Sequence, residues 1–145
     1  MPLTLFVSCS DDDSLPSVDF SITLNNVALE NNVFYAVKGD VVEIENVAVK
    51  SLTDQSASVT GVRYYLSGVP IYGTIENPFV CDIETADLPV GKFTLNVTST
   101  ILQVDKSIAN AVINYPLVIV EKIEDLPDGA IIGTQTLTTR IQPKQ

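Results

Sequence analysis

Asp82 and Glu84 stand two positions apart in a stretch that alternates polar and apolar residues, and Asp87 follows shortly after them. Residues i and i+2 of a β-strand point to the same side, so both carboxylates are expected on one face. Carboxylate oxygens are ligands that Ca²⁺ prefers, which makes this stretch a candidate calcium site. A solvated strand face predicts the same alternation without any metal.

Glu43 and Glu45 form a second same-face pair. A glycosidase needs two carboxylates that face each other across a sugar, and neighbours along one strand do not flank a substrate in this way. The chain also has no histidine, which removes Ser-His-Asp and Cys-His nucleophile systems, His-containing zinc sites and haem ligation by His. We therefore expect a protein that is not an enzyme and that carries no cofactor.

Tyr65 and Tyr72 are expected to lie off the core face, where flat aromatic rings can stack on sugars. Ordinary surface tyrosines are equally at home on exposed strands, so this alternative stays open. Tyr64 differs from both, because it shares its parity with Val62 and Leu66 and is assigned to the core.

The charge balance argues against one class of partner. Eight Lys and Arg against eighteen Asp and Glu give a formal net charge of −10. Such a chain repels phosphate backbones and lacks the cations that drive nucleic-acid binding by counterion release. Nucleic acid is therefore not expected as a partner.

The N-terminal residues carry a motif: an apolar run ends in Phe6-Val7-Ser8, Cys9 follows, and Ser10, Asp11, Asp12 and Asp13 come directly after it. This resembles the lipobox of bacterial lipoproteins, and the acidic run resembles the export signal of Bacteroidetes-type surface lipoproteins. The resemblance implies that residues 1–8 are a truncated signal-peptide remnant and that residues 9–17 are an acidic linker lipidated on Cys9. Outer-membrane lipid would then be a partner and the cell surface the location.

Other interpretations of this segment remain. Its apolar run is far shorter than the roughly 20 residues of a transmembrane helix. No basic residue precedes that run, as one does in a signal peptide, and a start upstream of Met1 can account for this. The segment can also be a frayed acidic arm with an incidental cysteine, or Cys9 can pair with Cys81, although Cys81 has the parity of a core residue.

The body of the chain shows strand patterning. Val, Ile and Thr make up nearly a third of the residues, and these β-branched side chains favour strands. Short alternating segments recur from Val18 onward, separated by turn residues. A change of parity predicts a bulge near Asn46, residues 51–60 are polar enough for a loop, and Pro116 marks an edge or a break. We predict an all-β, immunoglobulin-like antiparallel β-sandwich of about seven to nine strands.

Part of this pattern is similar to bacterial immunoglobulin-like domains. The similarity lies in Val62–Gly68, Gly73–Thr74, Pro78–Phe79 and Leu88–Leu95, where glycine turns connect aromatic and apolar strands. It implies a binding or spacer module covering residues 18–122. Residues 123–145 form a C-terminal extension, expected to add one more strand.

Together these features predict a non-enzymatic cell-surface lipoprotein whose immunoglobulin-like module binds a protein or a glycan. Two alternatives remain open. One is a glycan-binding accessory of an outer-membrane polysaccharide-uptake system, and the other is a structural or adhesive subunit of a surface assembly.

Overall fold

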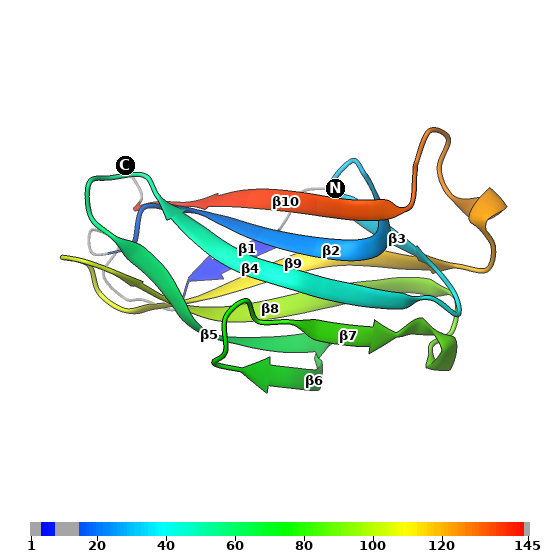
Figure 1. The fold of residues 1–145 in the computed structure, drawn as a ribbon, viewed down its shortest axis with the longest axis horizontal. Coiled ribbons are helices and arrows are strands. Elements are labelled where there is room, and N and C mark those ends of the chain that lie inside the picture. Colours follow the sequence, from blue (N-terminus) through cyan, green and yellow to red (C-terminus); the bar gives the residue numbers. More distant parts are fainter. Residues whose placement is uncertain (1–3, 8–14, 144–145) are drawn as a thin grey trace.

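The computed structural model describes residues 4–7 and 15–143, and these residues form mainly strands (Figure 1). Two short 3₁₀ turns, η2 (Thr85–Asp87) and η3 (Ile123–Asp125), interrupt them. The strands, in chain order, are β1 (Thr4–Val7), β2 (Val18–Glu30), β3 (Val33–Val37), β4 (Val41–Ser51), β5 (Ala57–Leu66), β6 (Val69–Thr74), β7 (Cys81–Glu84), β8 (Gly91–Gln103), β9 (Ala109–Val120) and β10 (Gly133–Ile141).

The strands lie in two packed sheets. The β2 sheet has the order β10-β2-β4-β7, and the β8 sheet has the order β6-β5-β8-β9. β1 and β3 pair end to end along the free edge of β9, with β1 on residues 111–114 and β3 on residues 117–120. Pro116 falls between these two pairings, so the predicted break occurs in the partners of β9 and not in β9 itself.

The connections have the pattern of an immunoglobulin-like β-sandwich. β5–β6 and β8–β9 are hairpins within one sheet, whereas β4–β5, β6–β7 and β7–β8 cross from one sheet to the other. This confirms the predicted fold class. One pair departs from the expected antiparallel arrangement, because β3 runs parallel to β9.

β2 belongs to both sheets. Its residues from Val18 to Asn25 pair with β4, whereas Ala28 to Glu30 pair with β3. The strand turns between these parts at Asn26, which has a φ of 66° and whose side chain donates to the Val41 carbonyl at 2.8 Å. Asparagine tolerates this left-handed conformation better than most residues, so the strand bends here and continues.

The bulge in β4 and the start of β5 bear on two local predictions. The bulge expected near Asn46 is present, because Thr23 pairs with Asn46 and Leu24 with Ile44, which leaves Glu45 unpaired. The loop expected over residues 51–60 was wrong in its second half, because β5 already begins at Ala57. Ala57 and Val59 pack partly buried against the core while Ser58 and Thr60 face solvent, an alternation that the polar composition hid.

The core fills the space between the sheets with alternate residues of each strand. Tyr64 is fully buried, as its parity predicted, and its hydroxyl donates to the Phe79 carbonyl at 2.6 Å. Tyr115 is also fully buried and meets Phe34 edge to face, with ring centroids 6.0 Å apart. Such aromatic pairs add to the free energy gained by burying the rings.

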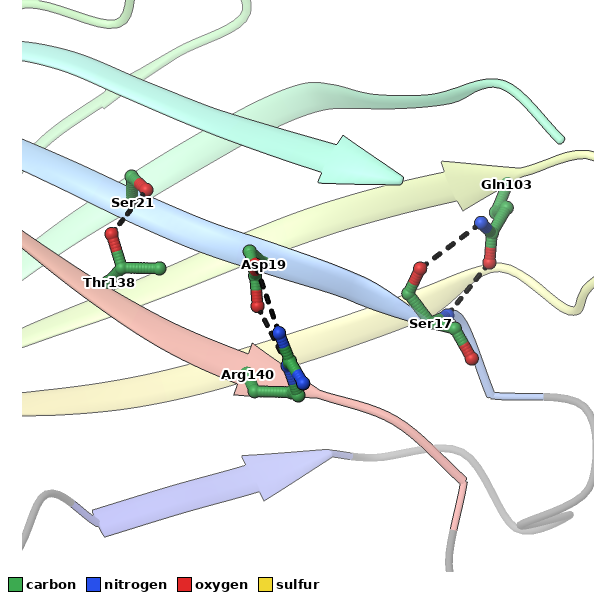
Figure 2. A network of polar contacts seen from close by, with 6 residues as sticks. All are labelled: Ser17, Asp19, Ser21, Gln103, Thr138 and Arg140. Atoms are coloured by element: carbon green, nitrogen blue, oxygen red, sulfur yellow. Dashed lines mark hydrogen bonds and ion pairs between the residues drawn. The ribbon is translucent and has the colours of Figure 1, made fainter. Parts of the chain in front are cut away.

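The C-terminal segment forms β10, which lies along β2 at the edge of the β2 sheet (Figure 1). Leu137 and Ile141 on its inner side join the core. On its outer side, Arg140 contacts Asp19 at 3.0 Å and Thr138 contacts Ser21 at 2.8 Å (Figure 2). β10 is therefore held by both of its faces.

Candidate functional site

The lipidation candidate Cys9 and the export-signal residues Ser10, Asp11, Asp12 and Asp13 lie outside the described residues, so their roles stay predictions. The described chain resumes at Leu15, which is buried. In the part of the chain that the structure describes, no helix has the length and apolar character needed to span a bilayer.

The start of the sandwich is fixed by a buried side chain that the sequence reading did not single out. The Gln103 side chain accepts from the Ser17 amide at 2.8 Å and donates to the Ser51 hydroxyl at 2.9 Å (Figure 2 shows its contact with Ser17). Gln103 is 5% exposed. The sequence could have indicated this role, because Gln103 continues the inward alternation of Leu95, Val97 and Ile101. A polar side chain buried at such a position needs hydrogen-bond partners.

The carboxylates do not assemble into the predicted calcium site. Asp82 and Glu84 are both exposed on β7, and Asp87 lies beyond them in η2. Across residues 15–143, no group of three or more His, Cys, Asp or Glu side chains is placed to hold a metal ion. The alternation of β7 is accounted for by one wet face and one core face.

The glutamates of β4 are likewise separated. Glu43 stands opposite Asp82 in the sheet register and accepts a hydrogen bond from the Asn25 side chain at 3.0 Å. Glu45 is the unpaired bulge residue and is exposed. The bulge at Glu45 therefore breaks the alternation that placed both glutamates on one face.

The two candidate tyrosines lie on different sides of the β8 sheet. Tyr65 pairs with Asn96 and is half-buried on the outer side. Tyr72 pairs with the core residue Tyr64, so it belongs to the inner side, and it is 52% exposed because β6 is an edge strand. Tyr72 borders the hollow described next, whereas Tyr65 is not among the residues that line it.

A hollow of about 1050 Å³ lies on the outer face of the β8 sheet, and we call it the outer hollow. It runs across β5, β6, β8 and the beginning of β9. Its lining is rich in hydroxyl, amide and charged groups and comprises Thr60, Gly61, Val62, Arg63, Tyr72, Gly73, Thr74, Ile75, Glu76, Thr98, Thr100, Asn110 and Val112.

Two glycines on adjacent strands keep the outer hollow open. Neither Gly61 nor Gly73 has a positive φ, so the backbone does not require glycine at either position. A Cβ at Gly73 would stand 3.5 Å from the Arg63 Cγ, and one at Gly61 would stand 3.6 Å from the Ile75 Cγ2, which are ordinary contacts. Glycine inside a strand weakens it and often marks a bulge or a place where a ligand comes close to the backbone. Gly61 directly follows a bulge at Thr60, whereas the pairing of Gly73 with Arg63 is regular.

Arg63 is the cation of the outer hollow. It pairs with Gly73 on one side and Thr98 on the other, and its side chain is exposed. No other residue of the described chain forms an ion pair with it, in contrast to Arg140, which is paired with Asp19. On the next row of the same face, the Thr100 hydroxyl donates to the Asn110 side chain at 2.8 Å.

Cys81 is a core residue, as its parity predicted, and its side chain is 7% exposed. Burial, with a smaller contribution from Asp82, raises the pKa of its thiol to about 11. The thiol is therefore protonated at neutral pH, which leaves it a poor nucleophile.

Comparisons with known proteins add little to this geometry. No family model matches the chain, and no curated protein matches it. Among solved structures, the chain is similar to the fibronectin(III)-like modules of CbhA from Clostridium thermocellum, with 12% sequence identity. That match covers 66% of this chain and 93% of the module, with a TM-score of 0.38.

Proposed function

We propose that this protein is a non-enzymatic module of a bacterial surface lipoprotein and that it binds a glycan in the outer hollow. The observation that carries the proposal is the presence of two glycines, Gly61 and Gly73, in the lining of that hollow. The residues around them have side chains that can form hydrogen bonds. Neither glycine has a φ that requires it, so each lowers the stability of its strand relative to alanine.

The chemistry of the lining suits a ligand rich in hydroxyl groups. Thr98 and Thr100 point outward from β8. The Thr98 hydroxyl can both donate and accept a hydrogen bond, and the Thr100 hydroxyl, which donates to Asn110, can still accept one. Glu76 adds an acceptor and Arg63 adds donors. A flexible polymer such as a polysaccharide can lie across an open hollow of this kind, since it needs no deep enclosed pocket.

The surface location rests on the N-terminal resemblance. Lipid on Cys9 would anchor the chain to a membrane without a spanning segment. The processing that makes Cys9 the first residue would also remove β1 from the edge of β9. Leu15, six positions after Cys9, is already buried in the sandwich, so the module would stand close to its anchor. Labelled palmitate should enter the full-length chain and its Cys81→Ala control but not Cys9→Ala, and protease should remove the module from intact cells. Label that persists in Cys9→Ala overturns the anchor.

The glycan proposal is tested on an array of plant, bacterial and host polysaccharides. We expect at least one polysaccharide to bind the wild-type chain and Gly73→Val to bind it at least tenfold more weakly. Gly133→Val is the matched control, because Gly133 also lacks a positive φ, has no atom within 4 Å of its Cβ position and lies on β10. Equal binding by wild type and Gly73→Val, or no glycan bound at all, overturns the proposal.

A second candidate, a protein partner or a second copy, is favoured by the outer edge of β6. Within the described residues β6 pairs only with β5, and several apolar side chains beside this edge are exposed, among them Val69 (63%) and Ile75 (83%). An open apolar edge can accept a further strand. This candidate predicts concentration-dependent association that Val69→Lys abolishes, and a strictly monomeric sedimentation profile argues against it.

A further inference from the structure

We propose that the glycan bound in the outer hollow carries carboxylate groups, as uronic-acid polymers do, and that Arg63 is the residue that selects them. The inference rests on the proposed function and names its ligand class. It comes from a guanidinium that the fold holds in the hollow without a partner carboxylate.

The position of Arg63 is set by the strands around it. It lies on β5 between Gly73 of β6 and Thr98 of β8. Because Gly73 has no side chain, the aliphatic stem of Arg63 lies beside that position, with its Cγ 3.5 Å from where a Cβ would be. Arg63 is exposed and is one of the residues that line the hollow.

The two arginines of the chain differ in what their donors contact. The Arg140 Nε and Nη2 both donate to the carboxylate of Asp19. Arg63 has no such ion pair with any described residue. A guanidinium presents a planar set of N–H donors that matches a carboxylate in a bidentate arrangement. An arginine that lines a hollow and has no ion pair therefore favours a ligand with a carboxylate group.

The neighbours of Arg63 complete the set of contacts that an acidic sugar needs. Thr98 on β8 can bond ring hydroxyls, and Glu76 at the border of the hollow can accept from them. Glu76 forms no ion pair with Arg63. A sugar with one carboxylate and several hydroxyls uses both kinds of group.

The overall charge makes the inference sharply testable. With a net charge of −10, the chain as a whole repels a polyanion. Any preference for the carboxylated form of a polymer must therefore come from a local contact. Lys92 provides a matched control, because it is an exposed cation on the same side of β8, roughly 20 Å from Thr98 at about 3.4 Å per residue.

The experiment compares uronic-acid polymers (polygalacturonate, alginate and hyaluronan) with their carboxyl-reduced forms by calorimetry. We expect the wild-type chain to bind at least one acidic polymer at least tenfold more tightly than its reduced form. Arg63→Gln should lose that preference and keep the weaker binding of the reduced form, Arg63→Lys should recover part of it, and Lys92→Gln should behave as wild type.

Three results overturn the inference, and they separate it from the proposed function. A neutral glycan that binds more tightly than any acidic one and is sensitive to Gly73→Val but not to Arg63→Gln removes the acid selectivity and leaves the glycan site. An acid preference that Arg63→Gln leaves intact removes the role of Arg63. Absence of binding to every acidic polymer overturns the inference, and absence of binding to every polysaccharide of the array overturns the proposed function as well.

Discussion

The two outer faces of the sandwich both carry polar residues, but these residues have different surroundings on each face. On the β2 sheet, polar side chains of β10 and β2 pair with one another across the strands, as Ser21 does with Thr138 and Thr23 with Thr136. On the β8 sheet, Gly61 and Gly73 leave a hollow beside an arginine that has no ion pair with a described residue. The β8 sheet also pairs Thr100 with Asn110, but beside that pair it presents an arginine that has no ion pair with a described residue and whose donors a ligand can use.

The largest effect is expected where β10 meets the core. Leu137→Ala combined with Ile141→Ala removes two buried side chains, each of which costs roughly 2–5 kcal/mol in a well-packed site. The melting temperature should fall by about 10 °C or more, measured by calorimetry. Thr136→Ala with Thr138→Ala, on the outer side of the same strand, is the control. A fall of only a degree or two in the core variant would mean that β10 is a dispensable addition.

The glycines of the outer hollow are expected to act in the opposite direction. Gly61→Ala and Gly73→Ala should each stabilise the fold by about 0.5–1 kcal/mol, because alanine is less costly than glycine inside a strand and its Cβ meets only ordinary contacts. Denaturant unfolding measures this gain. Destabilisation by more than about 1 kcal/mol would show that the fold requires these glycines and that no ligand is needed to explain them.

The hydroxyl pairs between β2 and β10 sharpen the same comparison. Thr136→Val alone leaves the Thr23 hydroxyl without its partner and should cost about 0.5–1 kcal/mol, whereas Thr23→Val with Thr136→Val should be nearly neutral. Unfolding of both variants measures the difference. If the single and double variants lose equal stability, the pair does not hold β10 to β2 in the way described.

The smallest effect concerns the ion pair of the β2 sheet. The hydrogen bond that Arg140 donates to Asp19, together with the positive charge of Arg140, lowers the pKa of Asp19 below its ordinary value. A carboxyl whose pKa is lowered by folding adds stability above its unfolded pKa of about 3.9, and that stability is lost as the pH falls through the folded value. Asp19→Asn should therefore make stability less dependent on pH below about pH 4. If the free energy of unfolding of Asp19→Asn falls with decreasing pH in the same way as that of the wild-type chain, this account is contradicted.

The sequence predicted the interior well because strand parity is a local property. The inward places of Tyr64 and Cys81 follow from alternation alone, and so does the bulge beside Asn46. The sheet change of β2 was missed because it depends on the backbone at Asn26 and on which strands each half meets.

The candidate site was harder to predict for the same reason. The outer hollow forms because Gly73 pairs with Arg63 and Gly61 lies one row away, which is a matter of register between strands. Periodicity within one strand does not fix that register. The tyrosines drew attention because of their ring chemistry, but one shift in the pairing of β5 with β6 puts Tyr65 and Tyr72 on different sides of the sheet.

The central claim is that the two outer faces differ in function, and a titration of the ¹⁵N-labelled chain tests it most directly. The strongest polysaccharide found on the array is added as short oligosaccharides while amide resonances are recorded. The account predicts shifts concentrated at Gly61, Arg63, Gly73 and Thr98, with Ser21, Thr23, Thr136 and Thr138 unmoved. Shifts concentrated on the β2 sheet, or spread evenly over both faces, would contradict it.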